Sequence, residues 1–324
     1  MKIAVIGAGA VGGLLAARLA ESGHHISVVA RGQTLSAIQA NGLKVVGATN
    51  TPSVKVAADS NSSRLGIQDI VIIAVKTTAL HEIAPLIAPL LGDDTAVVCA
   101  MNGVPWWFFA DPTLPRAGLQ LLSIDPHGVL VQAIPAWRAI GCVVHLSTTS
   151  PAPGVIRPGL GNRLILGEAL GGMSVRLESI VALFCEAGFD ATPSAAIRED
   201  IWYKLWGNLT LNPLSAITGA TCDQLLDDPL VKTFCVNVMR EAAAIGEQIA
   251  CPIRLSSEER IALTRQLGAF KTSMLQDAES GKPLEIDALV GAVHEIGNHL
   301  DIETPHLKNL LGMARVFARC HGLV

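Results

Sequence analysis

Residues 1–31 restrict the fold more than any other stretch, because they join an apolar run, three spaced glycines and a helical pattern. The run at residues 3–6 is nearly continuous and apolar, as in a strand covered on both faces. Glycines follow at the G-x-G-x-x-G spacing, and apolar residues then recur at helical intervals until Gly23. A second apolar run covers 26–30. The stretch therefore predicts strand, glycine turn, helix and strand.

This glycine turn predicts a dinucleotide site. Gly7 permits a tight turn, Gly9 lets a pyrophosphate approach the backbone, and Gly12 lets the helix pack close to the strand. Free N–H groups at the helix start would face the phosphates. The expected cofactor-binding residues of the turn are Gly7, Ala8, Gly9, Ala10, Val11 and Gly12. The alternative is a glycine-rich turn without a ligand, but a position between strand and helix favours the dinucleotide.

Arg31 ends the second strand, where many NAD-binding proteins have an acidic residue. A carboxylate there accepts a hydrogen bond from the ribose 2′-hydroxyl and repels a 2′-phosphate, whereas an arginine can pair with that phosphate. The sequence therefore predicts NADP(H) as the cofactor. The alternative is a solvated surface arginine.

The composition indicates a well-buried globular protein with room for two domains: 324 residues, 50% hydrophobic and 16% charged. A net charge of -4 without any basic run predicts no nucleic-acid partner. The longest apolar stretch, 3–17, is broken by glycines and too short to span a bilayer, and the immediate first strand argues against a signal peptide. Seven cysteines without a C-x-x-C pair predict reduced thiols in a cytoplasmic protein, and no residue cluster has metal-ligand spacing.

Strands and helices alternate through residues 1–195, which predicts a Rossmann-like, doubly wound, mostly parallel sheet with helices on both faces. Further strands are expected at 43–46, 53–57, 69–75, 96–99, 140–146, 154–157 and 163–166, and helices at 33–41, 80–90 and 173–187. Residues 196–324 predict an all-helical domain, with helices at 197–211, 230–250, 257–267, 283–300 and 307–321.

In such a sheet, loops at the carboxyl ends of the strands surround the ligand. The glycine turn, Arg31, Lys76 and Asn102 all fall at such ends. We therefore expect the first domain to bind NADP(H) and the helical domain to complete the substrate site.

A dense aromatic patch, Trp106-Trp107-Phe108-Phe109, lies in the segment 104–139, in a chain that is only 4% aromatic. Several prolines in this segment argue against long regular elements. The patch is interpreted as a loop that buries its own aromatic side chains, as a wall of the substrate pocket or as a subunit contact.

Lys204, Asn208 and Asn212 interrupt an apolar helix at i, i+4 and i+8, and so share one helix face. A buried lysine with two amides is unfavourable unless a polar group meets them. Hydride transfer to a ketone leaves negative charge on its oxygen, and a lysine whose pKa is lowered by burial can donate a proton there. Neutral asparagines can bind substrate oxygens or hold the lysine. The alternative is a solvent-facing stripe, which more often carries Glu, Arg and Lys.

Together these features resemble the ketopantoate reductase (2-dehydropantoate 2-reductase) family over nearly the whole chain. The motifs that carry the resemblance are the glycine turn with Arg31, Lys76 at a strand end, Asn102-Gly103, the run 202–213, and the segment 272–277 with Glu285 twelve residues after Ser273.

The resemblance implies an NADPH-dependent reduction of ketopantoate to pantoate, on the route to pantothenate and coenzyme A. It implies that Lys204 donates the proton and that Glu285 hydrogen-bonds near the reacting oxygen or the cofactor. The implied substrate-binding residues are Asn102, Asn208, Asn212 and Ser273, with Ser273 near the substrate carboxylate. The implied cofactor contacts beyond the glycine turn are Arg31, Lys76, Asn102, Glu285 and the main chain at Ser147. Taken alone, Ser273 is typical of a surface or packing position, and Glu285 of a first helical turn.

The chain departs from the family at Thr221-Cys222-Asp223, where some members have a further substrate-binding asparagine, and in its longer, more aromatic segment 104–139. Two other functions therefore stay open: a same-fold NADP-dependent reductase of a different 2-oxo acid or ketone, and a non-catalytic NADP(H)-binding sensor. The presence of Lys204, Asn208 and Glu285 argues against the sensor, because a protein that only binds the cofactor does not require a proton donor. A short-chain dehydrogenase is disfavoured because Tyr203, the only tyrosine, adjoins Lys204. The apolar helical half would suit a homodimer.

Overall fold

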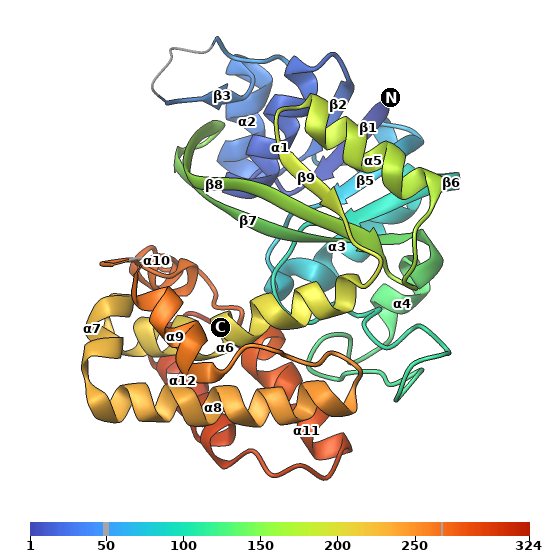
Figure 1. Cartoon of the computed structure of the whole chain (residues 1–324). Coiled ribbons are helices and arrows are strands. Elements are labelled where there is room, and N and C mark those ends of the chain that lie inside the picture. Colours follow the sequence, from blue (N-terminus) through green and yellow to red (C-terminus); the bar gives the residue numbers. More distant parts are fainter. Residues whose placement is uncertain (48–51, 267) are drawn as a thin grey trace. The chain divides into compact units, whose positions relative to one another are not determined.

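The computed structural model describes residues 1–47, 52–266 and 268–324. The chain forms two compact units, one of residues 1–101 and 128–198 and the other of residues 102–127 and 199–324 (Figure 1). This differs from the expected division into 1–195 and 196–324, because the chain leaves the first unit at residue 102 and returns at 128. Residues 102–127 belong to the second unit because their aromatic side chains pack against its helical residues.

The first unit is built on a sheet in which the described residues supply nine strands, in the order β3-β8-β7-β6-β5-β1-β2-β4, with β9 beside β8. All neighbouring pairs are parallel except β7 with β8, which confirms the doubly wound, mostly parallel sheet. The strands are β1 Lys2–Ile6, β2 His25–Val29, β3 Lys44–Val45, β4 Ala57–Asp59, β5 Gln68–Ile73, β6 Leu91–Cys99, β7 Ala139–Ala152, β8 Val155–Glu168 and β9 Asp190–Pro193.

The central strands are apolar throughout because both faces of the sheet are covered. Ile3 and Val5 of β1 belong to a core cluster that also contains Leu14 and Leu15, whereas Ala4, which points to the opposite face, is equally inaccessible. The helices of this unit are α1 Ala10–Glu21, α2 Gly32–Asn41, α3 Leu80–Ile87, α4 Val129–Ala133 and α5 Val175–Glu186, with 3-10 turns η1 Ser62–Arg64, η2 Thr77–Ala79, η3 Ala88–Leu90 and η4 Ala136–Arg138.

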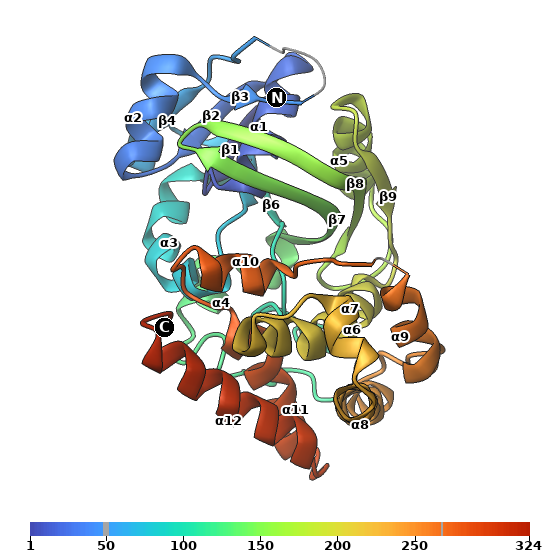
Figure 2. The ribbon, with the colours of Figure 1, turned by 90° about the vertical axis from the view of Figure 1, so that its left-hand side faces the viewer.

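The strands after residue 139 are longer than expected. The sequence predicts three short strands there, but β7 and β8 form one long antiparallel hairpin, which crosses over α1 in Figure 2. The turn follows Ala152, and Gly154 has a φ of +73°. The half of the hairpin nearest its turn carries many polar residues, so it lacks the apolar pattern by which a strand is predicted. It forms strands nevertheless, because pairing between β7 and β8 satisfies the main-chain hydrogen bonds. The strand expected at 53–57 is also displaced: Val54 makes an isolated bridge with Leu43, and β4 begins at Ala57.

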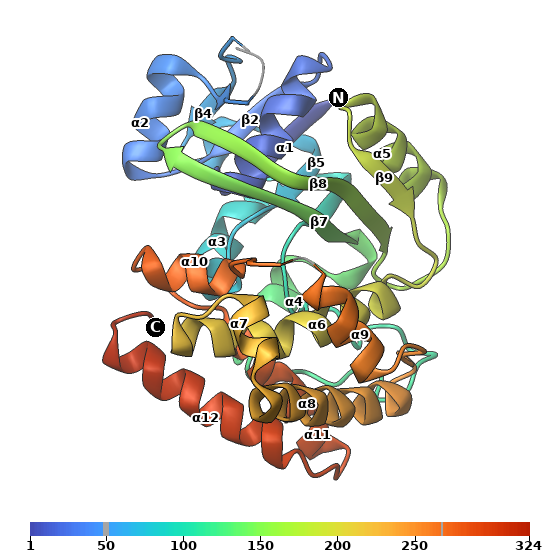
Figure 3. The same cartoon turned by 60° about the vertical axis from the view of Figure 1, so that its left-hand side comes forward.

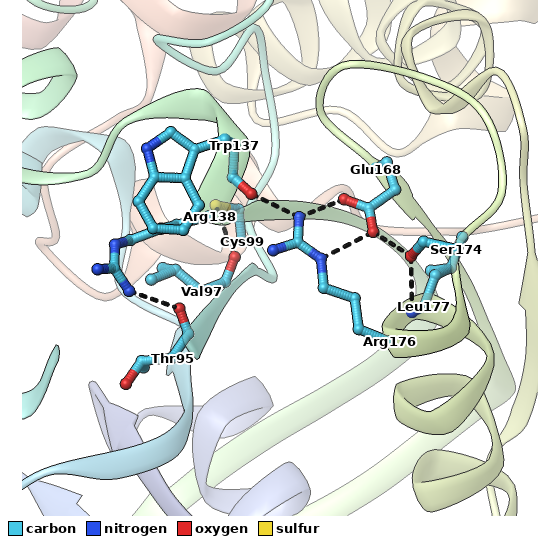
Figure 4. A network of polar contacts seen from close by, with 9 residues as sticks. All are labelled: Thr95, Val97, Cys99, Trp137, Arg138, Glu168, Ser174, Arg176 and Leu177. Carbon is cyan, nitrogen blue, oxygen red and sulfur yellow. Dashed lines mark hydrogen bonds and ion pairs between the residues drawn. The ribbon is translucent and has the colours of Figure 1, made fainter. Parts of the chain in front are cut away.

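The buried carboxylate of Glu168 connects three elements of this unit through hydrogen bonds (Figure 4). Glu168, at the end of β8 and 8% exposed, accepts hydrogen bonds from Ser174 and from Arg176, whose Nε lies 2.8 Å from Glu168 Oε1. Arg176 also donates to the carbonyl oxygen of Trp137 at 2.6 Å. Ser174 caps α5 by accepting from the N–H of Leu177. The network therefore ties the start of α5 to β8 and η4.

The second unit is mainly helical, as expected (Figure 3), and α6 Ile197–Thr218 supplies two of its buried aromatic side chains, Trp202 and Trp206. Trp206 Nε1 donates to the carbonyl oxygen of Met239 at 2.7 Å, which fastens α6 to α8 (Pro229–Gln248). The further elements are α7 Cys222–Asp227, α8 Pro229–Gln248, α9 Ser257–Arg265, α10 Ser273–Glu279, the π-helix η5 Asp287–Gly291, α11 Ala292–His299 and α12 Pro305–Cys320.

Three helix predictions need correction. α6 continues through Pro213 to Thr218, because burial of residues on both sides of the proline outweighs the lost hydrogen bond. The expected helix 283–300 begins instead as the π-helix η5 and only then becomes α11. The expected helix 257–267 is α9, which ends at Arg265, and Leu267 lies outside the described residues.

Residues 102–127 join the helical unit through their aromatic side chains and main chain. Trp106, Trp107, Phe108 and Phe109 are each at most 7% exposed. The ring of Phe108 lies 6.0 Å from that of Trp202 on α6. The carboxylate of Glu295 on α11 accepts from the N–H groups of Leu122 and Ser123 at 2.6 and 2.9 Å. The aromatic side chains are thus buried, as the first interpretation expects, but they pack against α6 as well as against one another.

Candidate functional site

The glycine turn has the shape that the sequence predicts. Gly7 has a φ of +94°, and a Cβ added there would lie 2.6 Å from Val75 Cγ1. A Cβ on Gly12 would clash with the carbonyl oxygen of Gly7, so only glycine allows α1 to start so close to β1. Gly9, by contrast, would have nothing within 4 Å of an added Cβ. It is the N-cap of α1, and open space before free N–H groups suits a phosphate.

The remaining residues of the turn follow from this start. Ala8 is 8% exposed and belongs to the core cluster, Ala10 is the first residue of α1 and Val11 the second. The turn therefore presents main-chain N–H groups rather than side chains, which fits a dinucleotide pyrophosphate.

Arg31 lies between β2 and α2 with its side chain 80% exposed. Its Nη1 is 2.6 Å from Oε2 of Glu82 on α3, whose side chain is 58% exposed. Ion pairs this exposed contribute about 0–1 kcal/mol to stability, so the guanidinium can exchange this carboxylate for a phosphate. Lys76 lies three residues after the end of β5, as the N-cap of η2, and is half-buried.

Ser147 does not present a spare hydroxyl in this structure. It lies on β7, where its Oγ accepts from the N–H of Leu160 on β8 at 2.7 Å and lies 3.2 Å from the carbonyl oxygen of the same residue. A role in cofactor binding would require its main chain, as the resemblance implies, rather than its side chain.

In the second unit, Lys204, Asn208 and Asn212, called the Lys–Asn ladder below, all lie on the single helix α6. Lys204 and Asn208 are half-buried and Asn212 is 6% exposed. Lys204 Nζ donates to Oδ1 of Asn102 at 2.8 Å. Two expected site residues, 102 positions apart in the chain, therefore meet at one hydrogen bond.

Gly103 holds this contact in place. It has a φ of +82°, and a Cβ there would lie 2.6 Å from the carbonyl oxygen of Ala288 and 2.8 Å from its Cβ. The N–H of Val104 donates to the same carbonyl at 3.2 Å. The turn that carries Asn102 is thus seated on the π-helix η5, and π-helical turns often occur at functional sites. Glu285 lies two residues before η5 and is 9% exposed.

Ser273 is the first residue of α10 and is exposed. The buried hydroxyl next to it, Thr272, caps α10 and lies 2.5 Å from Ser215 Oγ on α6. This pair fixes Ser273 relative to α6. Sequence reasoning missed it, because neither hydroxyl has a motif of its own.

Where some members of the resembled family have a further asparagine, this chain has the start of α7. Thr221 and Gln224 form a capping box, and Thr221 also donates to Asp223. Cys222 is 1% exposed, and burial together with Asp223 raises the pKa of its thiol to about 11. These side chains stabilise a helix start and leave the amides of α6 as the predicted ligands.

No group of three or more His, Cys, Asp or Glu side chains in the described residues is arranged to hold a metal ion. None of the helices in residues 1–47, 52–266 and 268–324 has the length and apolar character needed to cross a membrane.

Comparison with known proteins adds to this geometry. Residues 3–106 match the family model described as ketopantoate reductase PanE/ApbA, and residues 196–318 match the model of its C-terminal part. A 2-dehydropantoate 2-reductase of Mesorhizobium japonicum is 43% identical over 98% of this chain and 98% of its own length. A solved structure from Ralstonia solanacearum, described as a candidate ketopantoate reductase, has 56% identity and a TM-score of 0.97 over 100% of this chain and 99% of its own. That of 2-dehydropantoate 2-reductase from Methylococcus capsulatus has 26% identity and a TM-score of 0.84, covering 99% and 98%.

Proposed function

Because this chain belongs to the ketopantoate reductase PanE/ApbA family, and is therefore an NAD(P)-dependent oxidoreductase acting on CH–OH groups, we propose that it reduces 2-dehydropantoate to pantoate with NADPH. Bound NADPH supplies the hydride to the ketone carbon. The chain's own residues must bind the 2-oxo acid, orient its ketone and protonate the oxygen as charge develops there.

The hydrogen bond from Lys204 to Asn102 is the observation that carries this proposal. An ammonium group can both stabilise the developing oxyanion and give it a proton. Asn102 is neutral, so it orients the ammonium without taking the proton. Asn208 and Asn212, one and two turns further along α6, supply amide donors for the substrate, and Ser273 a hydroxyl. Glu285, almost fully enclosed next to η5, is the proposed carboxyl partner near the reacting oxygen.

NADP(H) rather than NAD(H) is proposed because of the charge at the end of β2. Arg31 is exposed and makes a surface ion pair with Glu82, and Lys76 lies three residues after β5. These two cations suit the 2′-phosphate, while the N–H groups of the turn 7–12 suit the pyrophosphate. A cytoplasmic location and a homodimer also stay predictions, the latter to be measured by sedimentation.

The test is NADPH oxidation with 2-dehydropantoate and a panel of other 2-oxo acids. We expect 2-dehydropantoate to have the highest kcat/KM, and Lys204→Ala to lower kcat by about 10²–10⁴-fold, the usual contribution of a general acid. NADPH affinity should hardly change. Lys271→Ala is the matched control, because Lys271 pairs with Glu279 in the same unit, and its rate should stay unchanged.

Absence of turnover with every 2-oxo acid and both cofactors would contradict the reductase and favour an NADP(H)-binding sensor. Preference for another 2-oxo acid would replace the substrate only. A Lys204→Ala variant with the original kcat would refute the proton donor.

A further inference from the structure

Arg260 lies on α9 and places its guanidinium directly against α6. A Cβ added at Gly207 would lie 2.9 Å from Nη2 and 3.2 Å from Nε of Arg260. The Cζ atom lies 5.2 Å from the centre of the Tyr203 ring. Any side chain at position 207 would displace the arginine, so Gly207 creates the space that the guanidinium fills.

The guanidinium of Arg260 has no anionic partner among the residues that the structure describes. Its Nε is buried without a hydrogen-bond acceptor. The neighbouring carboxylates on α9 are engaged elsewhere, since Glu258 pairs with Arg240 at 2.5 Å and Glu259 closes the capping box with Ser256. Leaving a charged donor buried and unsatisfied costs more than an ordinary lost hydrogen bond. The arrangement therefore favours an oxyanion as its partner.

This cation borders the Lys–Asn ladder. Gly207 is three residues after Lys204 and precedes Asn208, and residues three or four apart on a helix are surface neighbours. In this part of α6, the partly exposed residues are Tyr203, Lys204, Gly207 and Asn208, whereas Trp202, Leu205, Trp206 and Leu209 are buried. The accessible stripe of α6 thus carries the proposed proton donor, and Arg260 lies against the same stripe.

We propose that Arg260 forms a carboxylate-binding subsite beside Lys204, which selects 2-oxo acids over neutral ketones. The inference rests on the proposed reductase function. In a 2-oxo acid the carboxylate adjoins the ketone, so a guanidinium that holds the carboxylate also directs the ketone oxygen towards a neighbouring ammonium. Arginine suits this role because its planar fork remains charged and matches carboxylate geometry. The same guanidinium chemistry could take a cofactor phosphate, which the experiment below separates.

The test compares Arg260→Gln with the wild type on 2-dehydropantoate, on its neutral methyl ester and on NADPH. We expect KM for the acid to rise about 10- to 100-fold, as loss of a charge-assisted hydrogen bond predicts. The KM values for the ester and for NADPH should change by less than about twofold. Arg260→Lys should recover part of the loss, and Gly207→Ala should reproduce part of it. Arg254→Gln removes an exposed arginine from the same unit and should change none of the three KM values.

Binding gives a readout that does not depend on turnover. Oxamate, a non-reducible carboxylate of 2-oxo acid shape, should bind the NADP⁺-loaded wild type and Arg254→Gln in calorimetry, but not Arg260→Gln. Equal losses on acid and ester would assign Arg260 to packing alone, and a loss confined to NADPH would assign it to the cofactor. Either result, or unchanged oxamate binding, overturns the subsite. A wild type that binds oxamate but reduces no 2-oxo acid would instead contradict the proposed function.

Discussion

At the scale of single residues, Arg31 is the side chain that we predict to distinguish NADP(H) from NAD(H). Its guanidinium bridges to Glu82 at the surface, and both side chains are more than half exposed. Such a pair is screened by solvent and salt, so it holds the arginine near the end of β2 without consuming its charge. A 2′-phosphate carries more negative charge than a carboxylate and would compete well for the guanidinium.

Arg31→Ala should therefore weaken NADPH and leave NADH almost unaffected. The expected rise in KM for NADPH is about 10- to 100-fold, the range for loss of one charge-assisted hydrogen bond. Glu82→Gln is the matched variant, because it removes the competing carboxylate and should lower KM for NADPH slightly. Steady-state kcat/KM with each cofactor measures both effects. Equal losses for NADPH and NADH after Arg31→Ala would remove the argument for 2′-phosphate recognition.

At the scale of elements, the seating of the Asn102 turn on η5 is open to a sharp test. Gly103→Ala places a Cβ 2.6 Å from the carbonyl oxygen of Ala288 and strains a φ of +82°. Gly281→Ala meets the same kind of strain at a φ of +64° but has nothing within 4 Å. Strain alone costs about 1–2 kcal/mol in each variant, so any difference between them reports the contact with η5.

We expect Gly103→Ala to lower kcat about tenfold or more, because displacing Asn102 releases the ammonium of Lys204 from its orientation. NADPH affinity should stay close to the wild-type value. Gly281→Ala should lose a similar amount of thermal stability from strain but keep its kcat. If both glycine variants had equal kcat values, the orientation of Asn102 would not depend on the contact between Gly103 and η5.

The elements that the sequence predicts well are those whose own residues specify them. β1, α1 and β2 follow from an apolar run, glycines with distinct steric duties and a helical stripe. The hairpin of β7 and β8 and the π-helix η5 do not follow, because their main-chain partners come from tertiary pairing rather than local pattern. The local pattern also does not predict the full length of α6, because buried neighbours outweigh the effect of Pro213.

The candidate site likewise has a part that the local sequence predicts and a part that depends on contacts between distant segments. The spacing of Lys204, Asn208 and Asn212 is local and places all three on α6. The hydrogen bond to Asn102 joins distant segments, and only the resemblance anticipates that both belong to one site. Arg260 could not be found from the sequence, because its signal is a glycine at 207 that only the approach of α9 explains.

At the scale of the whole molecule, the chain crosses between its two units more than once. It leaves the first unit after Met101, returns at Gly128 and leaves again after Arg198. The inserted residues 102–127 bury four large aromatic side chains at 106–109 and bind their main chain to Glu295. A sequence-based boundary at 195 misses this, since linear order does not reveal which unit an excursion joins.

This connectivity predicts how fragments behave. A fragment of residues 1–195 lacks Trp202 and Glu295, so the aromatic side chains at 106–109 lose their partners and form an exposed apolar patch. We expect it to aggregate. A second fragment, in which a flexible linker of roughly ten residues replaces 102–127 within 1–198, keeps the sheet and the glycine turn and should be soluble. It should also retain weak NADPH binding, measured by fluorescence, because its predicted phosphate contacts are intact. Equal solubility of the two fragments in a sedimentation assay would show that residues 102–127 do not depend on the helical unit.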